Sequence, residues 1–169
     1  MREIEIPTER TILRRFRPED AGEVFACISP EITCFTAWEA PASEEAFAEV
    51  WKNWLPAMED GSELTLVPRS REDSRCLGIL GVHAIKSDTP ELGIWLRRDV
   101  HGKRFGNELI GAVARWVSKT QTVRYFEYPV AEENIASRRI AEAYGGEVRE
   151  HRQNRKYGCV VYHIPPMSA

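Results

Sequence analysis

The chain has 169 residues, a formal net charge of −3 and 43% hydrophobic residues. A chain of this length buries roughly 70% of its unfolded surface, so we expect one domain spanning residues 1–169. No stretch approaches the roughly 20 apolar residues of a membrane span, and the start of the chain has no apolar signal core. The slightly acidic balance gives no nucleic-acid footprint. We therefore expect neither a membrane nor a nucleic-acid partner.

The four cysteines lie far apart in the sequence and form no paired motif. This spacing favours reduced thiols, which are typical of a cytoplasmic protein. The histidines have no metal-ligand spacing with the cysteines, so no metal site is expected.

The first elements in chain order are a strand and two helices. Residues 12–16 are typical of a strand, and Pro18 suits the first turn of a helix that ends at Cys27. Ser29-Pro30 predicts a turn. Ser43 is a good N-cap for a second helix, whose apolar residues recur at helical spacing until Asp60-Gly61. The chain ends, residues 3–9 and 165–169, are expected to be mobile.

The remaining elements follow in order: strands over 63–67, 76–85 and 91–96, a helix through 109–117, a strand over 123–130, a helix over 134–144, and strands over 147–153 and 158–164. Consecutive strands between 63 and 96 predict antiparallel pairing. The strand–helix–strand order at 91–130 predicts a parallel pair with a crossover helix. We therefore predict an α+β (mixed α/β) fold, with a twisted mixed sheet of about six or seven strands flanked by about four helices.

The segment Asp99 to Ile110, DVHGKRFGNELI, joins a predicted strand to a predicted helix. The first N–H groups of a helix lack partners and attract anions, phosphate above all. Gly102 and Gly106 would allow close backbone approach, and Lys103 and Arg104 add positive charge. Neither the GxxxxGK[ST] nor the GxGxxG phosphate loop is present. A diphosphate-binding loop is one interpretation, and an ordinary basic helix cap is the alternative.

This loop resembles the diphosphate-binding segment of the GNAT acyltransferases, [QR]-x-x-G-x-[GA]. His101-Gly-Lys-Arg-Phe-Gly106 places Gly106 at the last position and Gly102-Lys103 at the common GK pair. Two positions depart from the pattern, because His101 replaces Gln or Arg and Arg104 replaces Gly.

Other segments extend the resemblance to residues 10–164. Asn134-Ile-Ala-Ser137 followed by Ala141 to Gly146 is similar to the family's NxxS helix. Arg10 to Asp20, and Pro30 to Trp38 followed by Ser43-Glu-Glu, resemble the RimJ/RimL-like branch of ribosomal-protein N-terminal acetyltransferases.

The resemblance implies transfer of an acetyl group from acetyl-CoA to a primary amine, by direct attack in a ternary complex. The acceptor would be a protein N-terminus or a small amine. The implied diphosphate-binding residues are His101, Gly102, Lys103, Arg104, Phe105, Gly106 and Asn107. The pantetheine arm would lie where strands 91–96 and 123–130 splay apart, against Trp95, Leu96 and Arg97, with Asn134 as a further contact.

For the chemistry, the resemblance places Ser137 beside the sulfur, where its hydroxyl could donate a proton or orient water; a helix-surface serine is the alternative. Many relatives carry a tyrosine acid seven positions after the asparagine, where this chain has Ala141.

Glu91 is the candidate general base. The alternative interpretation of Glu91 is an exposed carboxylate at a strand end. His83 is a second candidate base, although a lone histidine on a strand is usually structural.

Three aromatic residues are candidate acceptor contacts: Phe35, Trp38 and Tyr128. Trp51 and Trp54 recur at helical spacing and are assigned to the core. The absent tyrosine and the altered loop keep a second hypothesis open, a non-catalytic CoA-binding module. A homodimer is expected from the closing strands, which often pair in proteins that this one resembles.

Overall fold

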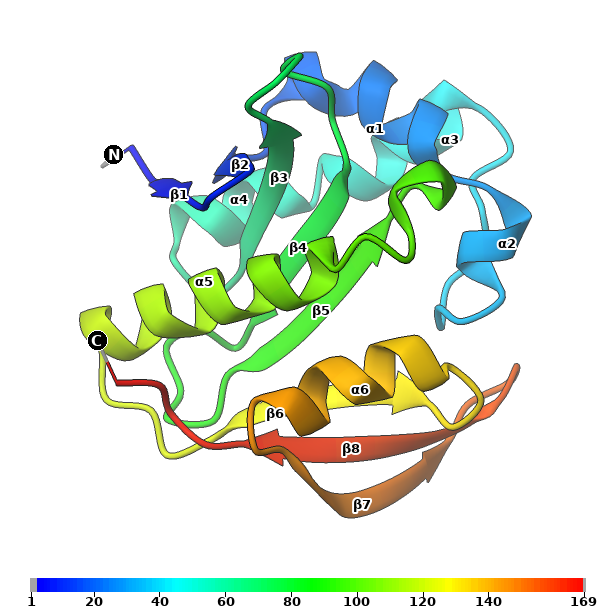
Figure 1. Ribbon diagram of the computed structural model, residues 1–169. Helices are drawn as coiled ribbons and strands as arrows, with labels where there is room; N and C mark the ends of the chain where they lie inside the picture. The colour runs from blue at the N-terminus through cyan, green and yellow to red at the C-terminus, as the bar shows by residue number, and fades with distance from the viewer. Residues whose placement is uncertain (1–2, 169) are drawn as a thin grey trace.

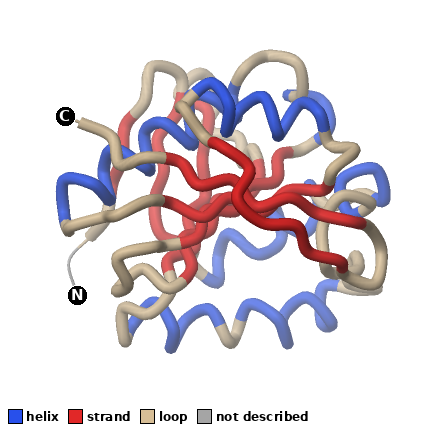
Figure 2. The backbone as a smooth tube through the Cα atoms, turned by 90° about the horizontal axis from the view of Figure 1, so that it is seen from below, coloured by secondary structure: helices blue, strands red, loops and turns tan. Residues whose placement is uncertain are grey.

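The computed structural model describes residues 3–168. One eight-stranded sheet runs through the molecule in the order β1-β2-β3-β4-β5-β6-β8-β7 (Figure 1). Its strands are β1 (Glu5–Pro7), β2 (Thr11–Arg15), β3 (Leu64–Ser70), β4 (Gly78–His83), β5 (Glu91–Leu96), β6 (Phe126–Ala131), β7 (Glu147–Gln153) and β8 (Gly158–Ile164). The α-helices are α1 (Ala21–Cys27), α2 (Pro30–Thr33), α3 (Glu44–Trp51), α4 (Trp54–Glu59), α5 (Phe105–Thr120) and α6 (Ile135–Ala143). Figure 2 shows helices on both sides of the twisted sheet.

The predicted class and pairing are confirmed. Strands β3, β4 and β5 pair in antiparallel order. Helix α5 carries the chain from β5 to β6, and these two strands pair in parallel at Glu91 and Glu127. The strand–helix–strand prediction for residues 91–130 is therefore correct.

Three local predictions were wrong. Residues 5–7 form the edge strand β1 rather than a mobile lead-in, because Ile6 is buried and pairs with Leu13 of β2. A turn of helix, α2, follows Ser29, with Pro30 at its first position, where its missing N–H costs nothing. The single helix predicted from Ser43 is two, because Pro56 is accommodated in the first turn of α4 and not in the interior of a longer helix.

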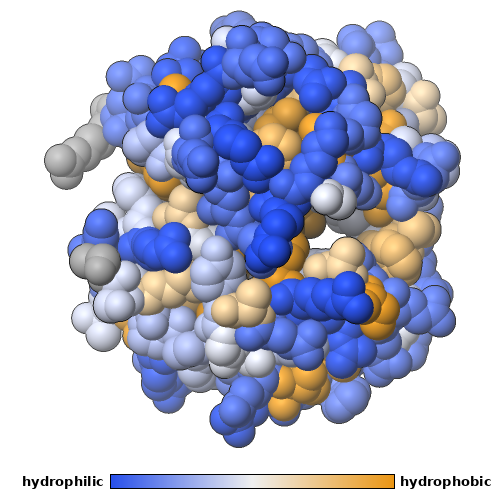
Figure 3. Space-filling model, viewed as in Figure 1, coloured by the Kyte–Doolittle hydropathy of each residue, from blue (hydrophilic) through white to orange (hydrophobic). Residues whose placement is uncertain are grey.

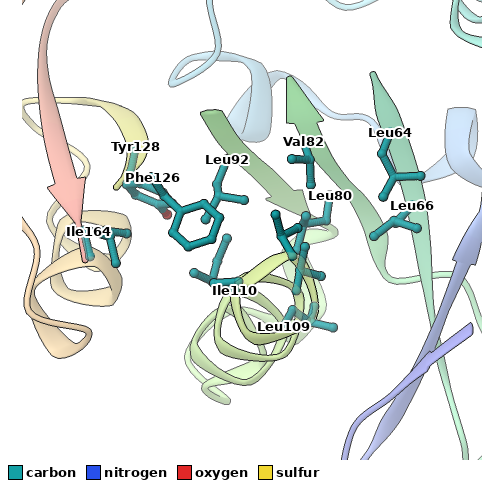
Figure 4. Close-up of a cluster of buried hydrophobic side chains, with 14 of the residues drawn as sticks. Leu64, Leu66, Leu80, Val82, Leu92, Leu109, Ile110, Phe126, Tyr128 and Ile164 are labelled. Atoms are coloured by element: carbon teal, nitrogen blue, oxygen red, sulfur yellow. The ribbon is translucent and has the colours of Figure 1, made fainter. Parts of the chain in front are cut away.

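Two apolar clusters fill the two faces of the sheet. The larger lies under α5, which buries residues on one face at helical spacing, Leu109, Ile110, Val113, Ala114 and Val117. Figure 4 shows Phe126 of β6 beside Leu92 of β5 and Ile110 of α5. The smaller cluster lies under α1, α3 and α4, where Trp51 and Trp54 pack as predicted. Burial of each large aliphatic side chain stabilises the fold by about 1.5–3 kcal/mol.

Candidate active site

The sheet opens between β5 and β6. Strand β5 pairs with β4 along its whole length, from Glu91 to Leu96, whereas its register with β6 links only Glu91 to Glu127. Glu127 N–H donates to the Pro90 carbonyl (3.0 Å). The backbone N–H and C=O groups of the odd-numbered residues of β6 therefore point toward β5. The next such residue is Pro129, which has no N–H to donate. The parallel ladder therefore stops there.

Main-chain groups of β5 face this opening. Arg97 N–H donates to the Leu77 carbonyl (2.8 Å), which assigns the odd-numbered residues of β5 to the β4 side. By alternation, the N–H groups of Ile94 and Leu96 point toward β6, beyond the last register pair. Figure 3 shows an open hollow in the molecule, at the place where β5 and α6 lie apart in Figure 1.

The loop after β5 is shaped by two left-handed residues. Gly102 has φ 77° and Arg104 has φ 63°. Arg104 is the N-cap of α5, so the free N–H groups at the start of the helix follow it directly. A Cβ built on Gly102 would meet no atom within 4 Å, so the space over this turn is open. The loop therefore offers free amides, positive charge and room for an anion.

His101 closes the loop from within. Its Nε2 donates to the Leu96 carbonyl (2.7 Å), at the end of β5. Arg97 is also engaged, because its Nε donates to Asp99 (2.6 Å). The side chains of His101, predicted to contact the cofactor, and of Arg97, predicted to contact it through its backbone, thus hold the loop together through protein contacts in this structure.

Replacing Arg104 with glycine should stabilise the protein. A non-glycine residue in the left-handed region costs roughly 1–2 kcal/mol, offset in part by the greater freedom of glycine in the unfolded chain. We expect Arg104→Gly to raise the free energy of unfolding by about 0.5–1 kcal/mol in urea denaturation, whereas Arg104→Ala, which keeps the backbone strain, should not. Lower stability of Arg104→Gly would contradict this reading of the loop.

The start of α5 is anchored by a residue that sequence analysis did not single out. Glu108 accepts hydrogen bonds from Thr8 Oγ1 and Arg10 Nε, at 2.5 and 2.8 Å, and the Arg10 guanidinium stacks over Phe105, 3.8 Å from the ring centroid. Partial burial would raise the pKa of Glu108, but these hydrogen bonds outweigh it and hold the pKa below its ordinary value. Contacts over such a sequence separation leave no local pattern in the sequence.

Gly106 serves packing between helices. A Cβ there would lie 2.5 Å from Cδ1 of Ile140, so its absence allows α6 to approach α5. Tyr144 reinforces this contact, since its hydroxyl donates to the Asn107 carbonyl (2.5 Å). Tyr144 therefore has a packing role at the end of α6. The start of α5 is thereby held against the C-terminal half of α6.

Asn134 and Ser137 lie at the start of α6. Asn134 caps the helix, and its Oδ1 accepts from Ser137 N–H (3.3 Å). The Ser137 hydroxyl lies 2.7 Å from the hydroxyl of Tyr128. Tyr128, predicted to contact the acceptor, is instead 2% exposed, because its side chain points into the core under α5 and α6. The strand alternation of Phe126, Tyr128 and Val130 was the signal for this burial.

Glu91 lies in a row of titratable residues that crosses the sheet on the face opposite α5. Register pairs link His83 to Glu91, Glu91 to Glu127, and Glu127 to His163. His83 Nδ1 donates to Glu63 (2.6 Å), and this hydrogen bond gives His83 a structural role. Burial raises the pKa of Glu91; His83 opposes this rise and the negative charge of Glu127 adds to it. Glu91 is therefore a stronger base than an ordinary glutamate.

Exposed aromatic side chains lie beside the opening. Phe35 and Trp38 are each 38% exposed, and the Trp38 ring meets that of Trp95, with centroids 6.0 Å apart. Lys156, in the hairpin between β7 and β8, donates to the carbonyls of Thr33 (2.5 Å) and Trp38 (3.2 Å). This bridge ties the aromatic segment to the far side of the opening.

The chain thus combines an opened mixed sheet with a left-handed, cationic loop after strand β5. Residues 10–147 match the family model of the acetyltransferase (GNAT) domain, so the chain belongs to this family and is an acetyltransferase. No curated protein matches it in sequence. No helix within residues 3–168 is both long and apolar enough to cross a membrane.

Solved structures share the fold at low identity. An acetyltransferase from Salmonella typhimurium that modifies the N-terminal serine of ribosomal protein L7/L12 has a TM-score of 0.84 at 14% identity, over 98% of this chain and all (100%) of that one. Ribosomal-protein-S5-alanine acetyltransferase from Vibrio fischeri gives 0.83 at 12%, over 96% and 97%. Spermidine N-acetyltransferase from Vibrio cholerae, in complex with CoA and spermine, gives 0.79 at 16%, over 93% and 96%. The RimJ/RimL-like resemblance thus holds in the fold.

Proposed function

We propose that the protein transfers the acetyl group of acetyl-CoA to a primary amine held in the opening between β5 and β6. The observation that carries the proposal is the end of the β5–β6 ladder after Glu91 and Glu127, next to the open loop at Gly102. Main-chain donors face the opening from β5, and free helix amides face the loop. These are the groups that a linear chain of amides ending in a diphosphate requires.

The residues present fit this cosubstrate. The amides of residues 102–107, with the cations Lys103 and Arg104, would hold the diphosphate, whereas the His101 N–H donates to the Arg98 carbonyl (3.1 Å). Asn134 uses its Oδ1 for the helix cap, which leaves its amide nitrogen for a carbonyl of the pantetheine arm. The N–H groups of Ile94 and Leu96 would bind that arm and the oxyanion that forms when the amine attacks the thioester.

The acceptor is proposed to enter from the face that carries Glu91. Glu63, Glu91 and Glu127 gather carboxylates here, with Arg152 as the neighbouring cation, and a primary amine in water is mostly a cation. Glu91 would take a proton from the amine, directly or through water, so that the neutral amine attacks. Phe35 and Trp38 would contact the rest of the acceptor. A protein N-terminus and a small polyamine both meet these requirements.

The test is release of free thiol from acetyl-CoA by the purified protein. The acceptor panel comprises peptides beginning with serine or alanine, spermidine, and a small aliphatic monoamine. We expect thiol release that depends on at least one amine, with mass spectrometry showing the acetylated product. Binding of CoA without release on any acceptor would contradict the proposal and favour the second candidate, a non-catalytic CoA-binding module.

Replacing Glu91 with glutamine should raise stability at alkaline pH while weakening activity. Because the folded-state pKa of Glu91 is raised, the folded protein binds this proton more tightly than the unfolded chain. The resulting stabilisation is present below the ordinary pKa of glutamate and is lost as pH rises through the raised value. We therefore expect Glu91→Gln to melt at higher temperature than wild type at pH 8, with no difference near about pH 4.

The matched control is Glu147→Gln, an exposed carboxylate whose residue pairs with His163 in the same row. It should change neither melting temperature nor activity. The activity of Glu91→Gln should also lose its rise with pH. A melting temperature for Glu91→Gln below that of wild type at pH 8 would show that the carboxylate stabilises the fold.

A further inference from the structure

Two hydroxyl groups pair behind the opening, at the contact between β6 and α6. Tyr128 Oη and Ser137 Oγ are 2.7 Å apart. Within residues 3–168, each hydroxyl has the other as its only hydrogen-bond partner. The Tyr128 side chain is 2% exposed and lies in the main apolar core, whereas Ser137 is only partly buried, in the first turn of α6.

The direction of this hydrogen bond follows from the acceptors available. A tyrosine hydroxyl has one hydrogen, and leaving it unpaired in the core costs about 1–3 kcal/mol. Ser137 Oγ is the one acceptor that the described contacts offer to it, so Tyr128 donates and Ser137 accepts. The hydrogen of Ser137 is then free of any protein acceptor and turns away from the core. Burial raises the pKa of Tyr128 to about 12, so the tyrosine stays protonated and keeps this direction at working pH.

We propose that Tyr128 is a positioning residue for acetyl transfer, which orients the Ser137 hydroxyl so that its hydrogen points at the sulfur of the thioester. The inference rests on the proposed function, because it needs a thioester in the opening. Ser137 lies one helical turn before Ile140, whose side chain contacts Gly106 of the diphosphate loop. Helix α6 also begins directly after the part of β6 that has separated from β5, so a group bound along the opening passes Ser137.

The proposed step requires no net proton from the tyrosine. The amine nitrogen forms a bond to the carbonyl carbon, and the C–S bond then breaks with its electron pair passing to sulfur. Ser137 donates a hydrogen bond to the sulfur as this negative charge develops. Because Glu91 already holds the proton that it took from the ammonium form, the proton released by the nitrogen after attack passes to water, and the thiolate takes up a proton from solvent. Tyr128 holds the serine oxygen throughout, which strengthens the serine as a donor.

The experiment compares Tyr128→Phe with Tyr162→Phe. Tyr162 is the cross-strand partner of Tyr128 on β8 and is equally buried, but its hydroxyl accepts from Nε of Arg138 (3.0 Å) and not from the Ser137 hydroxyl. We expect Tyr128→Phe to lower kcat about tenfold, as loss of one neutral hydrogen bond allows, with KM for acetyl-CoA unchanged. Tyr162→Phe should keep the wild-type kcat. Equal losses of kcat in the two variants would overturn the inference.

A double-mutant cycle with Ser137→Ala separates positioning from structure. If Tyr128 acts through Ser137, adding Tyr128→Phe to Ser137→Ala should lower kcat no further. A full tenfold loss in the Ser137→Ala background would overturn the inference, since the tyrosine would then act on something else. Absence of amine-dependent thiol release by the wild type would instead contradict the proposed function. The two failures are thereby distinguished.

Discussion

Gly102→Val is expected to abolish the thermal stabilisation that acetyl-CoA gives the protein. A ligand at about 100 times its Kd stabilises the folded state by about 2.7 kcal/mol, which in a chain of this length raises Tm by roughly 5–10 °C. In Gly102→Val the shift should fall to within about 1 °C of zero, as an affinity loss of about 100-fold would produce. Differential scanning fluorimetry with and without acetyl-CoA measures both values.

Two physical effects act together at Gly102. With φ at 77°, a β-branched residue is strained, and the turn would shift to relieve that strain. The space over Gly102 is empty of protein atoms within 4 Å of a built Cβ, so the valine methyl groups would occupy the volume assigned to the diphosphate. The amides could then neither approach the anion nor keep their direction.

Gly61→Val is the matched control for this prediction. Gly61 has the same φ of 77° but lies in the turn before β3, remote from the loop. Its variant should lose a similar amount of intrinsic stability through backbone strain, while its acetyl-CoA shift stays at the wild-type value. A wild-type shift in Gly102→Val would show that the diphosphate lies elsewhere.

The parts of the fold and site that sequence predicts are those set by local chemistry. The glycine at position 102 and the cations beside it identify a loop that must turn sharply next to charge, and the structure has a left-handed turn there. The asparagine at position 134 predicts a helix start, and it caps α6. Helix α5 follows its apolar spacing from Leu109 to Val117.

The parts that sequence does not predict depend on contacts between distant segments. In the sequence, Glu108 is an ordinary acidic residue in the first turn of a helix. Only the fold brings Thr8 and Arg10, next to strands β1 and β2, into contact with it. Strand β1 is three residues long, too short for an alternating pattern to distinguish it from a loop. Pro129 stands inside a predicted strand, and only the register of β6 shows that its missing N–H would face β5.

Ser137→Ala should lower kcat by about 100-fold and leave the KM for acetyl-CoA within about twofold of wild type. A positioned donor to a leaving group contributes about 10² to 10⁴ in rate, and it acts mainly in the transition state, where the sulfur carries charge. Binding should survive because the cap does: Asn134 Oδ1 accepts from the backbone N–H of residue 137, which alanine retains. Ser118→Ala, in α5 next to the C-terminal segment through Met167, is the matched control and should leave kcat unchanged. A rise in KM with unchanged kcat would assign Ser137 to cofactor binding. Wild-type values for both constants would show that Ser137 does not donate to the leaving sulfur.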